Sequence, residues 1–179
     1  MSSCIQRVHD SLLLSTLSLF LMTFSTGIQA ADDVVVVLEV FSVHKQEGGN
    51  EAFRPAERAQ PGDVLEYRAT YRNRGSAAAR KLEATLPVPA GNIAYIADSA
   101  RPQAVLASLD GQRFDAPPLK RTVKQADGRQ QVETVPAAEY RFLRWKLGDL
   151  PAGASTTVVS RMRVAPLEAQ AAAVQGGKQ

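Results

Sequence analysis

The fold of this chain is decided by the stretch 61–75, which reads PGDVLEYRATYRNRG. After the opening Pro-Gly-Asp turn, apolar and polar residues alternate up to Arg72, and the Asn-Arg-Gly that follows is typical of another turn. Successive side chains of a strand point to opposite faces, so the alternation predicts a half-buried β-strand. Its core face consists of Leu65, Tyr67, Ala69 and Tyr71.

The same alternation returns later in the chain. Residues 81–86 form a second predicted strand, which Pro87 and Gly91 bring to an end. Residues 139–147 and 156–164 form a later pair, which we expect to be joined by a tight turn over 148–153. In this pair the inward positions include Leu143, Trp145, Val158, Ser160 and Met162.

The other segments also have the composition of strands and turns. Residues 34–43 are an almost unbroken β-branched and aromatic run, which predicts a strand that is covered on both faces or that spans two sheets. Short strands are expected at 92–97 and 104–109, and an Asp-Gly turn at 127–128 predicts a polar hairpin at a sheet edge. Eight or nine short strands without an amphipathic helix predict one all-β domain, an antiparallel β-sandwich.

The first 30 residues have the pattern of a secretory signal peptide. Arg7 gives a weakly basic start, an apolar run covers 12–24, and the small-residue ending at 28–30 resembles a cleavage site. We expect cleavage after Ala30 and export to a periplasm or to the cell exterior. A retained transmembrane helix is the alternative, but the run is shorter than the roughly 20 apolar residues that a bilayer requires.

The mature chain predicted from this cleavage, 31–179, has 149 of the 179 residues and no cysteine, because Cys4 leaves with the signal peptide. Apolar burial must therefore hold the fold without disulfides. We expect the sandwich over 31–165. The tail 166–179, rich in Ala, Gln and Gly, is expected to be disordered because it has little to bury.

Several motifs of the mature chain are similar to those of a known bacterial family. They are Pro61-Gly62-Asp63, Tyr67, Tyr71-Arg72-Asn73, Leu86-Pro87 to Ala90-Gly91, Ser108-Leu109-Asp110-Gly111 with Phe114, and Arg144-Trp145 through Leu150-Pro151-Ala152-Gly153. The pattern resembles the conserved-repeat domain of unknown function in exported and surface proteins. That resemblance implies an immunoglobulin-like fold and implies no catalytic residues. The family often occurs as tandem modules, and this chain carries a single copy.

The recurrent positions have a structural interpretation of their own. Asp63 can close the turn that starts a strand, Gly75 and Gly91 permit backbone angles that other residues avoid, and Trp145 can fill the space between two sheets. The full set of residues predicted to be structural is Pro61, Gly62, Asp63, Tyr67, Asn73, Gly75, Pro87, Gly91, Trp145 and Gly153.

The mature sequence offers little for catalysis or metal binding. His44 is its only histidine, and neither a cysteine nor a Gly-x-Ser-x-Gly elbow is present. We therefore predict no catalytic residue, no cofactor and no transition-metal site. Acidic residues could hold calcium if they met at one pole of the sandwich, although no Asp-x-Asp-x-Asp spacing occurs. These acidic residues are Asp32, Asp33, Asp98, Asp110, Asp115 and Asp127.

The charges of the mature chain do not indicate nucleic-acid binding. Removal of one basic and one acidic residue with the signal peptide leaves 20 basic and 17 acidic side chains, which are interspersed. Basic residues on the outward face of the first two strands form either a solvated face or a contact surface for an anionic lipid, glycan or acidic partner. They are Arg68, Arg72, Arg74, Arg80 and Lys81. That alternation has no aromatic residue on which bases or sugars could stack.

Three functions are compatible with these features. The first is an exported, non-enzymatic module of the cell envelope, monomeric in isolation, that binds an unknown protein partner through loops or through an edge strand. The second is a periplasmic assembly factor or chaperone that works by strand addition, which requires an accessible edge with an apolar groove. The third is a ligand-binding or enzyme module, which requires a pocket with convergent polar groups.

Overall fold

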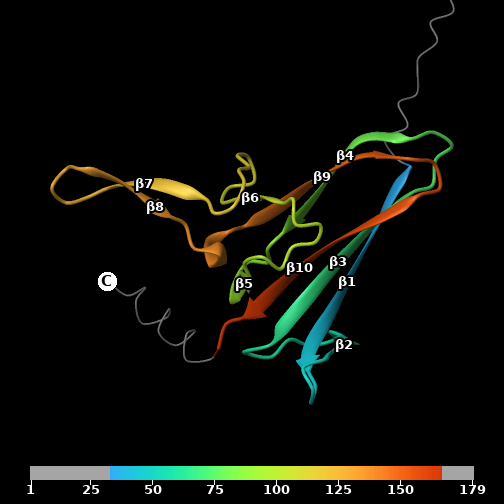
Figure 1. Cartoon of the computed structure of the whole chain (residues 1–179), viewed down its shortest axis with the longest axis horizontal. Helices are drawn as coiled ribbons and strands as arrows, with labels where there is room; N and C mark the ends of the chain where they lie inside the picture. The colour runs from blue at the N-terminus through green and yellow to red at the C-terminus, as the bar shows by residue number, and fades with distance from the viewer. Residues whose placement is uncertain (1–32, 167–179) are drawn as a thin grey trace, which may run out of the picture.

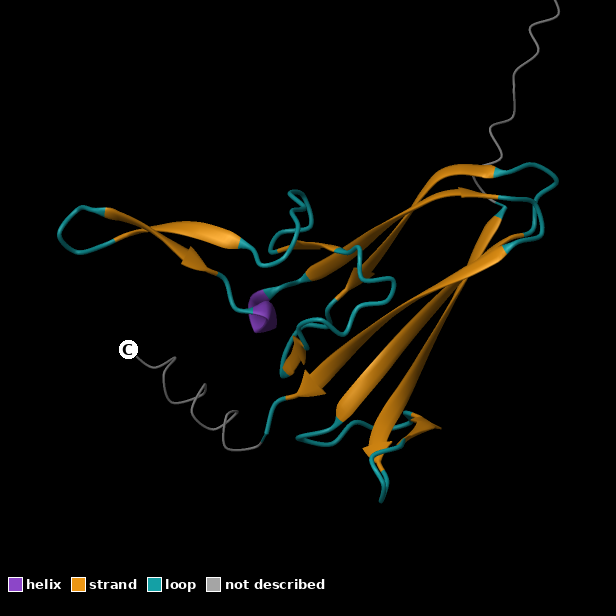
Figure 2. Ribbon diagram, viewed as in Figure 1, coloured by secondary structure: helices purple, strands orange, loops and turns teal. Residues whose placement is uncertain are grey.

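The computed structural model describes residues 33–166, and within that range the protein is all-β and antiparallel. The predicted signal peptide and the predicted tail from Leu167 onward lie outside the described residues. Ten strands and one short 3-10 helix, η1 (Ala137–Glu139), make up the regular structure of 33–166. Figure 2 shows the strands in orange and η1 as a single purple turn.

Eight of the ten strands form two layers. The larger sheet has the order β2-β1-β3-β10-β5 and consists of β1 (Val34–Lys45), β2 (Glu51–Pro55), β3 (Val64–Asn73), β5 (Ile93–Tyr95) and β10 (Ser155–Val164). The smaller sheet has the order β4-β9-β6 and consists of β4 (Ala79–Pro87), β6 (Leu106–Ser108) and β9 (Phe142–Leu150). The β3–β4 and β9–β10 connections cross between the layers at the same end of the molecule, at the upper right of Figure 1.

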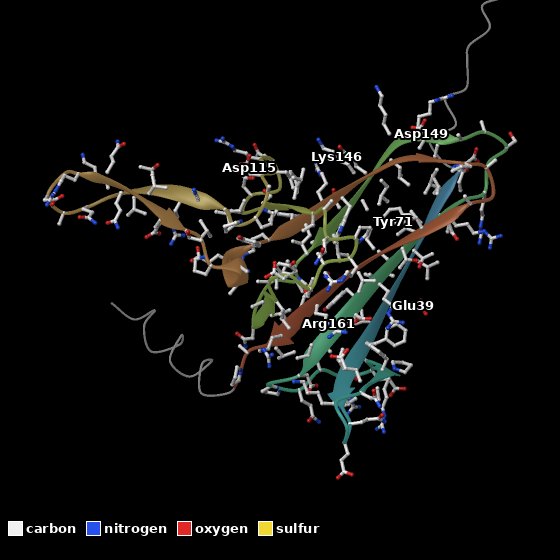
Figure 3. The ribbon with its side chains drawn as sticks, viewed as in Figure 1. Glu39, Tyr71, Asp115, Lys146, Asp149 and Arg161 are labelled. Atoms are coloured by element: carbon white, nitrogen blue, oxygen red, sulfur yellow. The ribbon has the colours of Figure 1, made fainter. Side chains whose placement is uncertain are left out.

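The core lies between the two sheets and confirms the alternation read from β3. Leu65, Tyr67, Ala69 and Tyr71 are all buried, and Tyr71 lies in the space between the layers in Figure 3. The second sheet contributes Ala84 and Leu86 from β4 and Leu143 and Trp145 from β9, and β10 contributes Val158 and Met162. Because the apolar side chains of both sheets face the same interior, their burial is the main favourable contribution to folding.

Strand β1 differs from both predictions made for it. It remains in one sheet, where Val36 pairs with Tyr71 and Leu38 pairs with Ala69, so both side chains are on the core side. Yet Val36 is 50% exposed and Leu38 is 53% exposed. A three-stranded sheet cannot cover all of a five-stranded one, and the part of β1 left open is its middle, since Val34 and Val40 pack against the core.

Two other segments also differ from expectation. Strand β9 continues through Gly148 to Leu150, so the turn predicted over 148–153 begins only at Pro151. The polar hairpin, β7 (Lys120–Lys124) and β8 (Gln130–Thr134), forms a separate two-stranded sheet and does not extend an edge of the sandwich. Figure 1 shows it projecting away from both layers.

One buried hydroxyl in the core has no partner. The Oγ of Ser160, a residue that is 0% exposed, forms no hydrogen bond with any residue of 33–166. Because an unsatisfied buried polar group is destabilising, Ser160→Ala is expected to raise the free energy of unfolding by about 1 kcal/mol. The matched control is Ser108→Ala, because Ser108 is equally buried but its Oγ bonds to the Gly111 N–H at 2.9 Å. Thermal melts that show Ser160→Ala to be as destabilising as Ser108→Ala would contradict the assignment.

Candidate functional site

The Pro61-Gly62-Asp63 turn holds the start of β3 against the end of β10. Gly62 has φ +92°, and its N–H donates to the Val164 carbonyl at 3.0 Å. The Asp63 carboxylate accepts the Gln60 N–H at 2.8 Å and so closes the turn. The motif therefore fixes two neighbouring strands and leaves no group directed at a ligand.

Asn73 joins the loops at the opposite end of the sandwich. Its Nδ2 donates to the carbonyls of Ala77 and Leu150 at 2.8 and 2.9 Å, and its Oδ1 accepts the Gly75 N–H at 2.9 Å. Its main-chain carbonyl accepts the Gly153 N–H at 2.9 Å. One buried amide thus connects the β3–β4 loop with both ends of the β9–β10 connection.

The glycines of the motif are needed for different reasons. Gly91 and Gly153 have φ of +97° and +72°, which side-chain-bearing residues rarely adopt. Gly75 is not in that region, so the expectation of an unusual backbone angle there is wrong. A Cβ at Gly75 would instead lie 2.4 Å from Oδ2 of Asp33, and the constraint is this close approach.

Trp145 lies in the interior and Pro87 lies at the surface. Trp145 is 1% exposed, and its Nε1 donates to the Pro102 carbonyl at 2.9 Å. Pro87 is the exposed last residue of β4, where it pairs with Phe142. Tyr67 is buried on β3. None of the residues singled out from the motifs converges on a shared surface site, so a candidate site has to be sought elsewhere.

The first candidate site is the open edge of β1. Strand β2 pairs with β1 only from Phe41 to Lys45, and the Ala56 N–H to the Val40 carbonyl, at 2.9 Å, is the last bond along that side. Beyond that bond, residues 34–39 pair with β3 on one side, and on the other side no strand of residues 33–166 pairs with them. We call residues 34–39, with the sequence VVVVLE, the β1 edge.

The β1 edge lacks the features that usually protect an edge strand. Such features are lysines, prolines, bulges or very short strands. Strand β4, the edge of the smaller sheet, carries Arg80 and Lys81 at a register shift, and β5 and β6 have three residues each. The β1 edge instead exposes half of each of Val36, Val37 and Leu38, the last two at 52% and 53%. It is the one long, apolar and unguarded edge within residues 33–166.

The second candidate site is a charged cluster on the outer face of the larger sheet. Glu66 is buried, and its two oxygens accept the Nε of Arg68 at 2.7 Å and the Nε of Arg161 at 2.8 Å. Arg161 also forms a bidentate pair with Glu51 of β2, at 2.8 and 2.7 Å. Figure 3 shows Arg161 on β10, so the cluster joins β10, β3 and β2 across one face.

Two aromatic rings lie over the same cluster. The Arg68 guanidinium carbon is 4.5 Å from the ring centre of Phe41 and 4.7 Å from that of Phe53. These cation–π contacts join β1 and β2 to the arginine of β3. The outward alternation of β3 itself has no aromatic residue, and the two rings over it come from the neighbouring strands β1 and β2.

A groove of about 470 Å³ runs along this charged cluster. Its polar lining consists of Lys45, Glu51, Glu66, Asp98, Ser99, Arg101, Arg161 and Arg163. Since Arg161 and Glu66 bond to one another and to Glu51 and Arg68, their charges are already neutralised within the cluster. The arrangement suits a structural ion-pair network better than a site that binds a charged ligand.

A second groove, of about 630 Å³, lies where the β7–β8 hairpin leaves the sandwich. It is lined mainly by small and apolar residues, which include Ala100, Val105, Pro117, Pro118, Pro136 and Ala137. Tyr95 and Tyr140 stack at its base with ring centres 6.1 Å apart. The Tyr140 hydroxyl accepts the Leu119 N–H at 3.0 Å, so it serves the fold.

The ion pair between Arg161 and Glu51 predicts a pH effect on stability. The Arg161 hydrogen bond lowers the pKa of Glu51 below 4.5, and the same bond raises the pKa of Arg161. A carboxylate with a lowered pKa stabilises the fold above its unfolded pKa, and the effect disappears as pH falls through the folded value. Glu51→Gln should therefore melt slightly below wild type at neutral pH, and the two melting temperatures should converge well below pH 4.5. A constant difference across that range would contradict the assignment.

The residues considered for chemistry are separated in the structure. His44 is exposed near the end of β1, where it pairs with Ala52. Asp110 accepts the N–H groups of Arg113 and Gln112, which lower its pKa, and Asp127 does the same for Arg129. Among residues 33–166, no group of three histidine, cysteine, aspartate or glutamate side chains is close enough to hold a metal ion.

The fold and its surfaces define a class: an all-β, two-layer antiparallel sandwich with one open apolar edge. Comparisons with protein-family models, with curated proteins and with solved structures find no match to the chain. In the part of the chain that the structure describes, no helix has the length and apolar character needed to cross a membrane.

The sequence predicts neither the open β1 edge nor the ion pairs of the charged cluster, although it places Arg68 on the outward face. The run 34–43 was recognised as a strand, but its apolar side chains were assigned to the interior. The number of strands in the second sheet decides how much of β1 is covered, and the sequence of 34–43 holds no information about that number. Glu66 is on the outward side of the alternation, and its burial comes from Arg161, which lies directly opposite it on β10.

Proposed function

We propose that this protein is an exported, non-enzymatic, immunoglobulin-like module of the cell envelope that binds another protein by accepting one of its strands at the β1 edge. The observation that carries this proposal is the β1 edge itself, with unpaired main-chain groups and half-exposed Val36, Val37 and Leu38. In β-strand addition, main-chain hydrogen bonds supply affinity and alternate side chains supply specificity.

Burial of the exposed side chains favours an added strand over a permanently free edge. Full burial of a valine or leucine side chain contributes about 1.5–3 kcal/mol, so covering the exposed half of each contributes about 1 kcal/mol. An added strand would also satisfy main-chain donors and acceptors of β1 without rearranging the sandwich. The edge is therefore a pre-formed acceptor, which lowers the ordering cost of binding.

The same edge supports the second candidate function, a periplasmic assembly factor or chaperone. That role requires an accessible edge with an apolar groove, and the half-exposed Val36, Val37 and Leu38 of the β1 edge support the first part of that requirement. The two roles differ in lifetime, because a chaperone releases the bound chain to another partner and a permanent envelope module does not. The third function is less favoured, since Glu51, Glu66 and Arg161 of the first groove are neutralised within the ion-pair cluster and the second groove is lined mainly by small and apolar residues.

Matched lysine substitutions test the proposal. Val37→Lys places a charge on the β1 edge, where Val37 is 52% exposed, and Val132→Lys places one on β8, where Val132 is 62% exposed. Both variants should retain the wild-type melting temperature. Used as bait with envelope extract, wild type and Val132→Lys should capture the same saturable partner, and Val37→Lys should retain at most ~10% of it, as expected for a charge in an apolar contact. Equal capture by all three proteins would exclude the edge as the binding surface.

A further inference from the structure

We infer that the strand accepted at the β1 edge runs antiparallel to β1 and carries a basic side chain at its N-terminal end, opposite Glu39, followed by alternating apolar residues. This inference rests on the proposed function and specifies the chemistry of its partner. It follows from the direction of the main-chain groups, from the position of β2 and from the charges around Glu39.

The main-chain groups of Val36 and Leu38 point toward the open side. The Val40 carbonyl faces that side, because it accepts the Ala56 N–H. In an antiparallel ladder, alternate residues bond to the same neighbour, so Leu38 and Val36 point the same way as Val40. The residues between them, Val37 and Glu39, direct their main-chain groups toward β3, where they pair with Thr70 and Arg68.

Strand β2 sets the line that an added strand would follow. It pairs with β1 in antiparallel register and stops at Pro55, opposite Phe41. A strand in the same line and the same direction would begin where β2 stops, beside Glu39, and would end beside Val34. Antiparallel pairs are slightly more stable than parallel ones, and every strand pair of both sheets is already antiparallel.

The charge at this starting point is negative. Glu39 is exposed, and among residues 33–166 it forms no ion pair. Its cross-strand neighbour, Arg68, is bound to Glu66 at 2.6 Å. Glu57, also exposed, follows directly after Ala56 at the end of the occupied part of the edge. A lysine or arginine opposite Glu39 would therefore face a carboxylate that no ion pair within residues 33–166 neutralises.

A second copy of this chain fits the edge less well. Antiparallel self-pairing through the outward-pointing residues would place Val36 on the twofold axis and Val34 opposite Leu38. The same register places Glu39 opposite Asp33 of a second copy. Like charges directly opposite each other destabilise a strand pair. Self-pairing centred on Val37 instead would place Glu39 opposite Val35, so neither register supplies the cation that a basic foreign strand brings to Glu39.

Capped synthetic peptides test the chemistry and the direction together. The probe is acetyl-Lys-Val-Thr-Val-Thr-Val-amide, whose valines would lie opposite Leu38, Val36 and Val34. The controls are the reversed sequence with lysine last and the same sequence with glutamate first. The readout is NMR titration of the mature protein, with protection of the Val36 and Leu38 amides from hydrogen exchange. The lysine-first peptide should bind ~2–5-fold more tightly than either control, the difference expected of one cross-strand charge pair.

Two variants separate this inference from the proposed function. Leu38→Pro removes an N–H that faces the open side and should abolish amide protection at Val36 with every peptide. A thermal melt establishes that this variant is folded. Glu39→Lys leaves the main chain unchanged and should reverse the preference in favour of the glutamate-first peptide.

The outcomes are distinct. Peptides that bind equally well, with binding that Leu38→Pro abolishes, would overturn the basic, antiparallel partner and leave strand addition in place. Binding that Leu38→Pro does not affect would overturn strand addition at this edge, and the absence of binding by any peptide would overturn the inference. Light scattering that shows a dimer of the free protein, lost in Leu38→Pro, would assign the edge to a second copy instead.

Discussion

Replacing Trp145 with alanine is expected to lower the free energy of unfolding by about 3–5 kcal/mol, because the indole is the largest fully buried side chain in the core. The loss has two parts. The substitution leaves a cavity between the sheets, and it leaves the Pro102 carbonyl without the Nε1–H that now bonds to it at 2.9 Å. For a chain of about 150 residues, this corresponds to a melting temperature lower by ~6–20 °C.

Trp145→Phe is the control for this prediction. Phenylalanine keeps most of the buried apolar volume and removes only the hydrogen bond to Pro102, so it should cost less than half as much as alanine. Denaturant titration of the three proteins gives the comparison. If the alanine variant unfolds at the wild-type midpoint, the core is not organised around this side chain.

Replacing Asn73 with alanine is expected to cost about 2–4 kcal/mol, the second largest effect. Asn73 is 1% exposed, and its side chain makes three hydrogen bonds to main-chain groups. Two of those partners, the carbonyls of Ala77 and Leu150, would be left without a donor. Since these bonds hold the connections between the layers together, hydrogen exchange should rise first in the β3–β4 and β9–β10 loops.

The control for Asn73 is the exposed Asn92, whose side chain contributes no hydrogen bond within residues 33–166. Asn92→Ala should change the unfolding free energy by less than about 0.5 kcal/mol, as surface substitutions usually do. Similar losses for both alanine variants would show that Asn73 does not carry the connection between the layers.

The β1 edge brings a risk together with its binding capacity. An exposed apolar edge pairs readily with other chains, and most proteins protect such edges. Here only Glu39 provides a charge within residues 34–39. Such an apolar edge is consistent with a surface that a bound strand covers. The variants Val37→Lys and Leu38→Pro test whether a strand binds there.

The amino-acid sequence by itself determined the fold class and the core. The alternation in 64–72 and 156–164 placed Leu65, Tyr67, Val158 and Met162 inside, because strand geometry sends alternate side chains to opposite faces whatever surrounds them. Burial of Trp145 followed from the same local rule.

Only the tertiary structure decided which surfaces remain open. Val36 and Leu38 have the same alternation as buried residues, yet they are half exposed because the smaller sheet does not extend over β1. Glu66 is buried on the outer face because Arg161, which is 95 residues away in the chain, bonds to it. Coverage and ion pairing depend on which distant strands become neighbours, and a local pattern holds no information about that.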